Sequence, residues 1–306
     1  MPEGDSLVRL AHRLHPVMFD QVIEHSDFRT PQFATLDLSG WLVTDILPTA
    51  KYLSITVAAP ANVTDTAQQL VVLSHLGMDG SWQIDTRPSY RTRCILRFAD
   101  HAVVGDSLKV LEVLPVDRAQ QQLEFLGPDL LDPAWDEPAT AQQLLAQSLK
   151  NFRQAPDQPI ATALLDQRLV SGIGNIFRCE VLFLAGMYPQ RAISVLSDEQ
   201  LTGLILLARD LMVINVPPRA ADRTRRRTVD VRPDPAAPFG VRVATATEQA
   251  RARADRRGSR RDPNFWVYGR QRQGCLRCGG PIRVEKLGTT PDNARDLHWC
   301  SNCQTG

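Results

Sequence analysis

Two cysteine pairs stand near the end of the sequence, Cys275-Leu276-Arg277-Cys278 and Cys300-Ser301-Asn302-Cys303. Four thiolates bind zinc tetrahedrally, and each Cys-x2-Cys turn brings two of them together. The 21 residues between the pairs make the spacing slightly longer than in the simplest zinc ribbons. About 40 residues are too few for an apolar core of their own. The pattern therefore predicts one structural zinc ion, with all four ligands from the protein and no position left for a catalytic water.

The amino-acid composition and the apolar runs exclude several classes of protein. Of the 306 residues, 43% are hydrophobic and 23% are charged, which excludes a disordered polymer, and the length suggests about two domains. No apolar run approaches the ~20 residues of a membrane span, and no basic segment followed by an apolar stretch opens the chain. We therefore expect a cytoplasmic protein that binds no membrane. In that compartment paired cysteines favour a metal over disulfides, and the isolated Cys94 and Cys179 are expected to be small buried side chains.

The net charge of +1 conceals a strong asymmetry along the chain. Residues 1–216 carry a net charge of −9, whereas residues 217–272 carry +9. Within the basic segment, the runs Arg223–Arg227 and 251–261 suit attraction to phosphate. A solvated insertion of low complexity explains the same composition, and this alternative stays open.

Hydrophobic patterning divides the chain further. Residues 6–18 have apolar residues at helical spacing, and the short runs of β-branched residues that follow are typical of a sandwich or barrel. Longer segments then carry helical periodicity, at 139–149, 159–168, 175–185 and 197–214. The patterning predicts a multidomain α+β protein, with a β-sandwich and leading helix first and a compact helical domain after it. The segment 217–263 has few large apolar residues, and we expect it to be an arginine-rich, mobile linker.

The amino terminus, Met1-Pro2-Glu3-Gly4-Asp5, carries a second chemical signal. Methionine before a small residue is normally removed, which leaves Pro2 with a free secondary amine. An α-amino group has a pKa of ~7.7–8.0, so a good share is neutral at pH 7 and can attack an aldehyde-level carbon to give an iminium. The Glu3 carboxylate beside it can shuttle protons. Taken alone, an ordinary chain end is an adequate alternative.

Several further motifs follow in one order. They are Ala50-Lys51-Tyr52-Leu53, His75-Leu76-Gly77-Met78-Asp79-Gly80-Ser81-Trp82, Leu126-Gly127-Pro128-Asp129-Leu130, Gly172-Ile173-Gly174-Asn175-Ile176-Phe177 with Glu180, Val267-Tyr268-Gly269-Arg270, and the paired cysteines. With the amino terminus, this series resembles the Fpg/Nei family of DNA glycosylases and AP lyases (formamidopyrimidine-DNA glycosylase and endonuclease VIII). The resemblance covers residues 1–303 except for most of 217–263. It implies a catalytic β-sandwich domain over 1–135, a helix–two-turn–helix DNA-binding domain over 136–216 and a zinc finger over 264–306.

The resemblance implies three catalytic residues. The family's nucleophile is the proline after the removed methionine, which is Pro2 here, and the next residue, Glu3, is the proton shuttle. Lys51 matches a lysine that helps catalysis and contacts phosphate, although Ala50 replaces the usual glycine. From the residues alone, Lys51 stands out because the chain has only four lysines and this one lies in an otherwise apolar predicted strand. A lysine at a strand edge is the alternative.

The resemblance also implies DNA contacts. His75, Asn175, Tyr268 and Arg295 match residues that clamp the phosphates around the lesion. The two glycines before Asn175 let backbone approach a phosphate, and the helix that follows offers N–H groups and a positive dipole end. Met78 matches the residue that fills the hole left by the extruded base, as a long apolar side chain can. A core methionine at a strand end is the alternative for Met78.

The implied reaction removes a damaged base through a Pro2 Schiff base and then cuts the strand by β,δ-elimination, without a redox cofactor or catalytic metal. Residues 1–5, 78–82 and 265–270 look more like the endonuclease VIII branch, especially its actinobacterial members. Residues 99–108 lack the arginine and phenylalanine of the purine-repair branch. We therefore expect a bifunctional glycosylase and AP lyase for oxidised pyrimidines. A formamidopyrimidine and 8-oxoguanine glycosylase, a non-catalytic DNA-binding relative and an unrelated zinc-ribbon protein are the alternatives.

The expected partner is damaged duplex DNA, bound by a monomer. Single-stranded DNA stays open as a further substrate. As a bacterial repair enzyme, the protein is expected in the cytoplasm, where it acts at the nucleoid.

Overall fold

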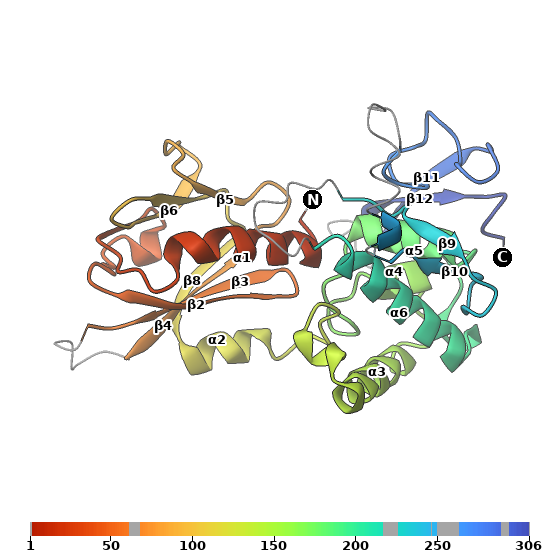
Figure 1. Cartoon of the computed structure of the whole chain (residues 1–306), viewed down its shortest axis with the longest axis horizontal. Helices are drawn as coiled ribbons and strands as arrows, with labels where there is room; N and C mark the ends of the chain where they lie inside the picture. The colour runs from red at the N-terminus through yellow and green to blue at the C-terminus, as the bar shows by residue number, and fades with distance from the viewer. Residues whose placement is uncertain are drawn as a thin grey trace. The chain divides into compact units, whose positions relative to one another are not determined.

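The computed structural model describes residues 2–60, 68–216, 226–245, 247–249, 263–288 and 294–305. Among these residues the chain divides into two compact units, of which the first runs to Phe125 and the second starts at Leu126 (Figure 1). Each unit has an apolar core of its own. Among the described helices, none combines the length and the apolar character needed to cross a membrane.

The first unit is a β-sandwich with a leading helix, as predicted. Helix α1 (Gly4–Met18) packs against a four-stranded sheet of order β2-β3-β4-β8, and a second four-stranded sheet has the order β1-β6-β7-β5 (Figure 1). Neighbouring strands in both sheets are antiparallel. The strands are β1 (His25–Phe28), β2 (Leu42–Thr49), β3 (Tyr52–Ala58), β4 (Gln69–His75), β5 (Ser81–Ile84), β6 (Thr92–Arg97), β7 (Ala102–Asp106) and β8 (Val110–Pro115).

One apolar core joins α1 to both sheets. The helix buries Leu7, Leu10 and Leu14, which recur every three or four residues and so share one face. In β3 every second side chain is buried, as expected for a strand with one face toward a core. Strand β4 is buried on both faces because helix α2 (Val116–Leu123) covers its outer side. The continuous apolar run in β4 reflects this double coverage.

Lys51 lies in a turn rather than in a strand, which corrects our prediction. Ala50 and Lys51 form the two-residue connection between β2 and β3, where Thr49 pairs with Tyr52. Ala50 has a φ of 53°, in the left-handed region that favours glycine. The glycine expected at this position therefore has a conformational reason, and the turn is what presents the lysine.

The second unit joins a helical domain and the cysteine-bearing segment in one core. Its helices are α3 (Pro138–Arg153), α4 (Ile160–Ala163), α5 (Asn175–Leu184) and α6 (Asp198–Val213), and its C-terminal hairpin pairs β11 (Ile282–Leu287) with β12 (Arg295–Cys300). Every residue of α5 is buried, and α5 contacts both α6 and β12. Phe177, Leu204 and Trp299 show that helices and hairpin share one apolar cluster. Short 3-10 turns in the two units lie at Pro31–Phe33, Pro133–Asp136 and Ile193–Val195.

Part of the segment 217–263 is folded, which its composition did not lead us to expect. Strand β9 (Val231–Pro233) pairs with β10 (Val241–Val243), and this inserted hairpin packs against α6. A Cβ on Gly203 of α6 would come within 2.9 Å of Phe239 Cε2, so the glycine makes room for the loop of the hairpin. The arginine-rich stretch 251–261 lies outside the described residues.

A substitution at Gly172 tests whether the turn before α5 requires glycine. Its φ is +97°, and a Cβ there would lie 3.1 Å from Met212 Cε and 3.2 Å from Asp129 Oδ1. We expect Gly172→Ala to lower the free energy of unfolding by about 1–3 kcal/mol, measured by chemical denaturation. Gly240→Ala is the matched control, because Gly240 has a φ of +67° but no atom within 4 Å of such a Cβ. An equal loss of stability in the two variants would contradict the crowding around Gly172.

Candidate active site, phosphate contacts and metal centre

The amino terminus is held by a helix cap. Glu3 is fully buried at the N-cap of α1 and forms a capping box with Ser6, in which the Glu3 N–H donates to Ser6 Oγ at 3.4 Å and the Glu3 side chain faces the Ser6 backbone N–H. The free N–H groups and the positive dipole end of a helix N-terminus favour a negative side chain at this position. Pro2 is half-buried one residue earlier. The cap therefore fixes the carboxylate next to an accessible proline.

His75 is a neutral hydrogen-bonding group at physiological pH. Burial, with the positive charges of Lys109 and Lys51, lowers the pKa of His75 to about 4. Its Nδ1 accepts the Gly77 N–H at 3.0 Å, so the proton resides on Nε2, and its ring lies 4.9 Å from that of Tyr52 on β3. An N–H donor with two lysines close enough to affect its pKa suits an anion such as phosphate.

Lys109 is a residue that our sequence analysis missed. Its backbone N–H donates to the His75 carbonyl at 2.9 Å, and its exposed side chain packs beside Gly77. The signal that could have identified it was the scarcity of lysine, because Lys109 is one of only four in the chain.

Met78 lies in the turn that follows β4, and 62% of its surface is exposed. The alternative of a core methionine is therefore wrong. A long, exposed apolar side chain on a tight turn is the type of group that can enter a base stack.

Asn175 opens helix α5 and attaches it to β12. Its Nδ2 donates to the Asp296 carbonyl at 2.8 Å, and its Oδ1 accepts from the guanidinium of Arg178, which is fully buried. Gly174 is the N-cap residue before it. The amide of Asn175 is thus engaged within the protein through both its Nδ2 and its Oδ1.

Glu180, in the same helix, organises the segment that carries Tyr268. The carboxylate is fully buried and accepts the backbone N–H groups of Trp266, Val267 and Tyr268 at 2.7, 2.9 and 2.8 Å. It also accepts from the Thr228 hydroxyl. Burial raises the pKa of Glu180, against the effect of these four donors. The carboxylate is the common acceptor for two segments that are far apart in sequence.

Tyr268 and Arg295 are both associated with β12. The Tyr268 ring lies 4.9 Å from the ring of His298, and Arg295 is the first residue of the strand. Asn175 and Tyr268 therefore lie against β12, the strand that Arg295 begins, and all three belong to the second unit. Pro2, Glu3, Lys51, His75 and Met78 all belong to the first unit.

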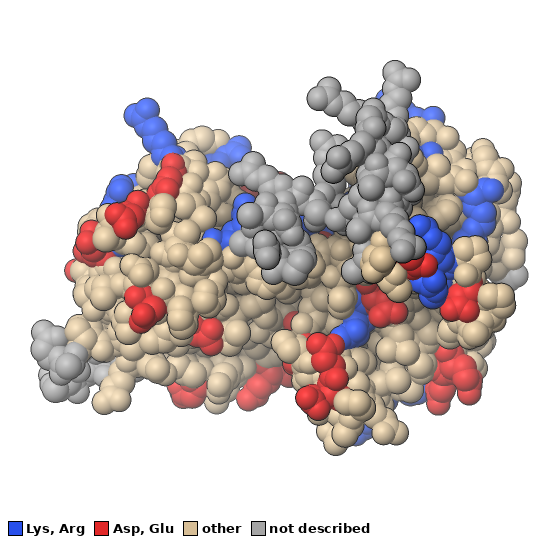
Figure 2. All heavy atoms as spheres, in the orientation of Figure 1, with Lys and Arg blue, Asp and Glu red and all other residues tan. Residues whose placement is uncertain are grey.

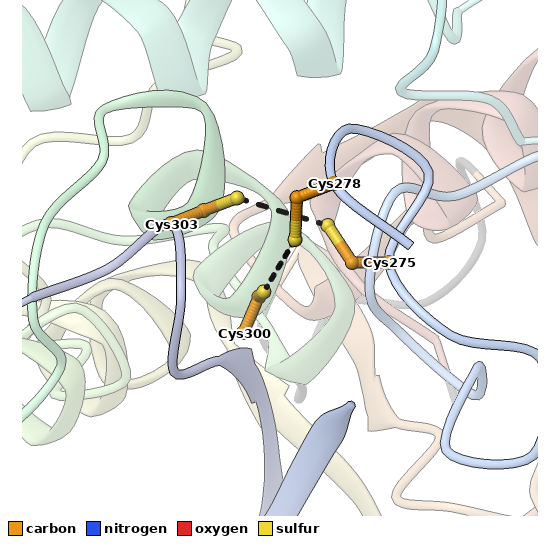
Figure 3. A group of neighbouring side chains, drawn as sticks. All are labelled: Cys275, Cys278, Cys300 and Cys303. Carbon is orange, nitrogen blue, oxygen red and sulfur yellow. Dashed lines mark hydrogen bonds between the residues drawn. The ribbon is translucent and has the colours of Figure 1, made fainter. Parts of the chain in front are cut away.

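The four cysteines converge at the end of β12. Their sulfur atoms all lie within 4.8 Å of one another and point toward a common centre (Figure 3). Cys275 Sγ lies 3.9 Å from Cys303 Sγ, and Cys278 Sγ lies 3.5 Å from Cys300 Sγ. A tetrahedral ion with ligands at about 2.3 Å would place its sulfurs about 3.8 Å apart. The four cysteines therefore fit a tetrahedral metal ion.

Backbone N–H groups support the same site. The Gly280 N–H lies 3.4 Å from Cys278 Sγ and, as the largest effect, lowers the pKa of that thiol to about 7. The Arg277 N–H donates to Cys275 Sγ at 3.4 Å. Such donors favour the thiolate form that binds a metal.

Acidic residues are frequent on the described surface. On the face drawn in Figure 2 they spread over both units, and the described basic side chains on this face stand in several separate places. This distribution agrees with the net charge of −9 on residues 1–216. Within residues 1–216, attraction to a polyanion would therefore rest on local groups of cations such as Lys51 and Lys109 rather than on the net charge of this part of the chain.

Comparison with known proteins identifies the family. The probable endonuclease 8 2 of Streptomyces coelicolor is 34% identical over 313 residues, which cover 100% of this chain and 95% of the relative. The model of the formamidopyrimidine-DNA glycosylase N-terminal domain matches residues 1–107, and that of the formamidopyrimidine-DNA glycosylase H2TH domain matches residues 126–218. The chain belongs to the formamidopyrimidine-DNA glycosylase family. The DNA-(apurinic or apyrimidinic site) lyase Nei2 of Mycolicibacterium smegmatis is 32% identical, covering 100% of this chain and 99% of the relative.

Solved structures share the fold of this family member. Formamidopyrimidine-DNA glycosylase of Lactococcus lactis, bound non-covalently to DNA with an AP site, matches with a TM-score of 0.69 and 19% identity, covering 99% of this chain and 100% of that one. The MutM protein of Thermus thermophilus matches with a TM-score of 0.69 and 22% identity, covering 99% of this chain and 98% of that one. These matches confirm the predicted fold.

The pKa of His75 predicts a loss of stability in acid. Because the unfolded chain binds this proton near pH 6.5 and the folded protein only near pH 4, stability is fully present above pH 6.5 and falls as the pH drops toward 4. We expect a contribution of about 1–2 kcal/mol, reduced by partial solvent screening. Denaturant unfolding of the wild type and of His75→Gln at several pH values measures it. Equal pH dependence of the two proteins would contradict a half-buried, neutral histidine.

Proposed function

We propose that this family member is a bifunctional DNA glycosylase and AP lyase of base excision repair. The observation that carries the proposal is Pro2 placed one residue before a buried glutamate that caps a helix. Relatives at 32–34% identity over the whole chain carry the names endonuclease 8 and DNA-(apurinic or apyrimidinic site) lyase. Pro2, Glu3 and Lys51 together argue against a non-catalytic DNA-binding relative, because binding requires none of this chemistry.

Pro2 supplies the nucleophile once Met1 has been removed. Its nitrogen forms a bond to C1′ of the damaged nucleotide while the bond from C1′ to the base breaks, and the base leaves with the bonding electrons and takes up a proton. The Glu3 carboxylate takes up the proton that the Pro2 nitrogen loses and delivers it to the ring oxygen of the deoxyribose, which opens the sugar and leaves an iminium between Pro2 and C1′. Loss of the acidified C2′ proton then expels the 3′ phosphate, a second elimination expels the 5′ phosphate, and water releases the sugar fragment from Pro2.

Two groups of residues are proposed to hold the DNA backbone. In the first unit, Lys51 offers a charge and His75 an uncharged N–H donor. In the second unit, Asn175, Tyr268 and Arg295 gather around β12. Phosphate contacts of this kind fix the register of the duplex and carry no sequence information, as suits a repair enzyme that acts at many sequences.

Met78 is proposed to fill the space left when the damaged nucleotide rotates out of the duplex. Rotation costs a few kcal/mol in lost stacking and pairing, and an inserted apolar side chain restores part of that stacking. The exposure of Met78 on a turn supports this role.

Oxidised pyrimidines are the proposed lesions. Residues 99–108 lack the arginine and phenylalanine of the purine-repair branch, and the relatives at 32–34% identity bear endonuclease 8 and Nei2 names. Damaged duplex DNA is the proposed partner of a monomer, with single-stranded DNA as a further substrate to test. The proposed location is the bacterial cytoplasm, at the nucleoid.

Borohydride trapping tests the amine mechanism. The tag-free protein would be offered duplexes that carry thymine glycol, 8-oxoguanine or an abasic site. We expect a covalent adduct on thymine glycol and on the abasic site, because reduction of the iminium fixes the sugar to Pro2. Pro2→Gly is the control and should lose at least about 99% of the adduct, since a primary amine in a different conformation replaces the secondary amine. An adduct mainly on 8-oxoguanine would overturn the lesion class, and none on any duplex would overturn the enzyme.

Zinc is the proposed ion of the four-cysteine site. It would act structurally, because protein sulfurs fill all four tetrahedral positions. We expect one zinc per chain by elemental analysis, and Cys300→Ser to abolish it and to weaken binding to abasic-site DNA by at least about tenfold as β12 loses its anchor. Cys94→Ser, at a buried cysteine of the first unit, is the control and should keep the zinc. A Cys300→Ser protein with a full complement of zinc would contradict the assignment.

A further inference from the structure

Thr228 connects the inserted segment to the phosphate-contact region. It is fully buried, and its hydroxyl donates to the Glu180 carboxylate. Its backbone N–H donates to the Asn264 carbonyl at 2.9 Å, and its own carbonyl accepts the Trp266 indole N–H at 3.1 Å. Every polar group of Thr228 is therefore bonded either to Glu180 or to the segment 264–266.

The residues next to Thr228 tie the same segment to the end of α6. Asn215 Nδ2 donates to the Arg227 carbonyl at 2.8 Å, and the Arg227 N–H donates to Asn215 Oδ1 at 2.7 Å. The Arg227 guanidinium donates to Asn264 Oδ1 at 3.1 Å and pairs with Asp230 at 3.2 Å. Residues 226–230 thus form a bracket between α6 and the segment 264–268.

The bracket supplies one of the four hydrogen bonds that the buried Glu180 carboxylate accepts. One oxygen of Glu180 accepts the N–H groups of Val267 and Tyr268, and the other accepts the Trp266 N–H and the Thr228 hydroxyl. A buried charge without its hydrogen bonds is costly, so the loss of one donor forces the carboxylate or its partners to rearrange. Three of the four donors are consecutive backbone groups that end at Tyr268, so a rearrangement of the carboxylate acts on the backbone that carries this residue.

We infer that Thr228 is a positioning residue for phosphate binding, acting through Glu180 on the backbone of residues 266–268. The inference rests on the proposed function, in which Tyr268 and Arg295 hold the DNA backbone. Shifts of about 1 Å in a positioned group are enough to lose much of its contribution to binding. Residues 226–230 therefore contribute to DNA binding, on this account, through their hydrogen bonds to Glu180 and to the segment 264–268.

Thr228→Val tests the inference, because valine keeps the shape of threonine and removes only the hydroxyl. We expect the Kd for a duplex with a tetrahydrofuran abasic-site analogue to rise about tenfold, the size of one lost hydrogen bond to a charged group. The rate constant of borohydride trapping at saturating abasic-site duplex should stay unchanged, since Pro2 and Glu3 are unaltered. Thr228→Ser keeps the hydroxyl and should bind within about twofold of the wild type.

Ser148→Ala is the matched control for a general loss of stability. Ser148 is fully buried in α3, and its hydroxyl donates to the Leu144 carbonyl at 2.8 Å, so the variant loses one hydrogen bond of the same unit outside the Glu180 network. It should leave the Kd unchanged. Hydrogen exchange of the peptide that covers 264–270 should be faster in Thr228→Val than in the wild type or in Ser148→Ala.

The possible outcomes separate this inference from the proposed function. A Thr228→Val protein with wild-type Kd, one that slows trapping as much as it weakens binding, or one that fails to fold would each overturn the positioning role. Equal effects of Ser148→Ala would do the same. A wild-type protein that binds the analogue but forms no adduct would overturn the proposed function and leave the Kd comparison intact.

Discussion

The arrangement of the second unit depends on the hydrogen bonds that one buried carboxylate, that of Glu180, accepts. Glu180 lies in α5, whose ten residues are all buried, and a charge at that depth is tolerable only with a full set of hydrogen-bond donors. Three donors come from the backbone of residues 266–268 and one from Thr228. Satisfying this one side chain therefore fixes where two distant segments of the chain lie against the helix. The position of Tyr268 is a consequence of that requirement.

The sequence predicted those features whose chemistry is local. Each Cys-x2-Cys pair indicates metal ligands within four residues, and Gly172 and Gly174 indicate a turn before Asn175. The inserted hairpin was not predictable in the same way, because its docking depends on Phe239 meeting Gly203 of α6, a contact that no periodicity within the segment encodes. Thr228 was invisible for the same reason, since its partner Glu180 is 48 residues away.

In the first unit, the backbone conformation places Lys51 in a turn, although the sequence predicted a strand there. A strand was expected around Lys51 because its neighbours are apolar, yet Ala50 adopts a φ of 53° and turns the chain there. A side chain on a two-residue turn lies beyond the ends of the paired strands. Successive side chains inside β3, by contrast, face the core and the solvent alternately. The turn therefore accounts for a charged residue beside an otherwise alternating strand.

Strand β12 connects the four-cysteine site to Arg295. The strand carries Arg295 at one end and Cys300 at the other, about 17 Å apart for six extended residues. Between them, Asn175 holds the Asp296 carbonyl and Cys179 accepts the His298 N–H at 3.3 Å, so α5 fixes the strand along its length. A metal at the cysteines adds a third anchor to a strand already paired with β11. Because an extended strand transmits displacement along its axis, an anchor at Cys300 constrains the arginine at the other end.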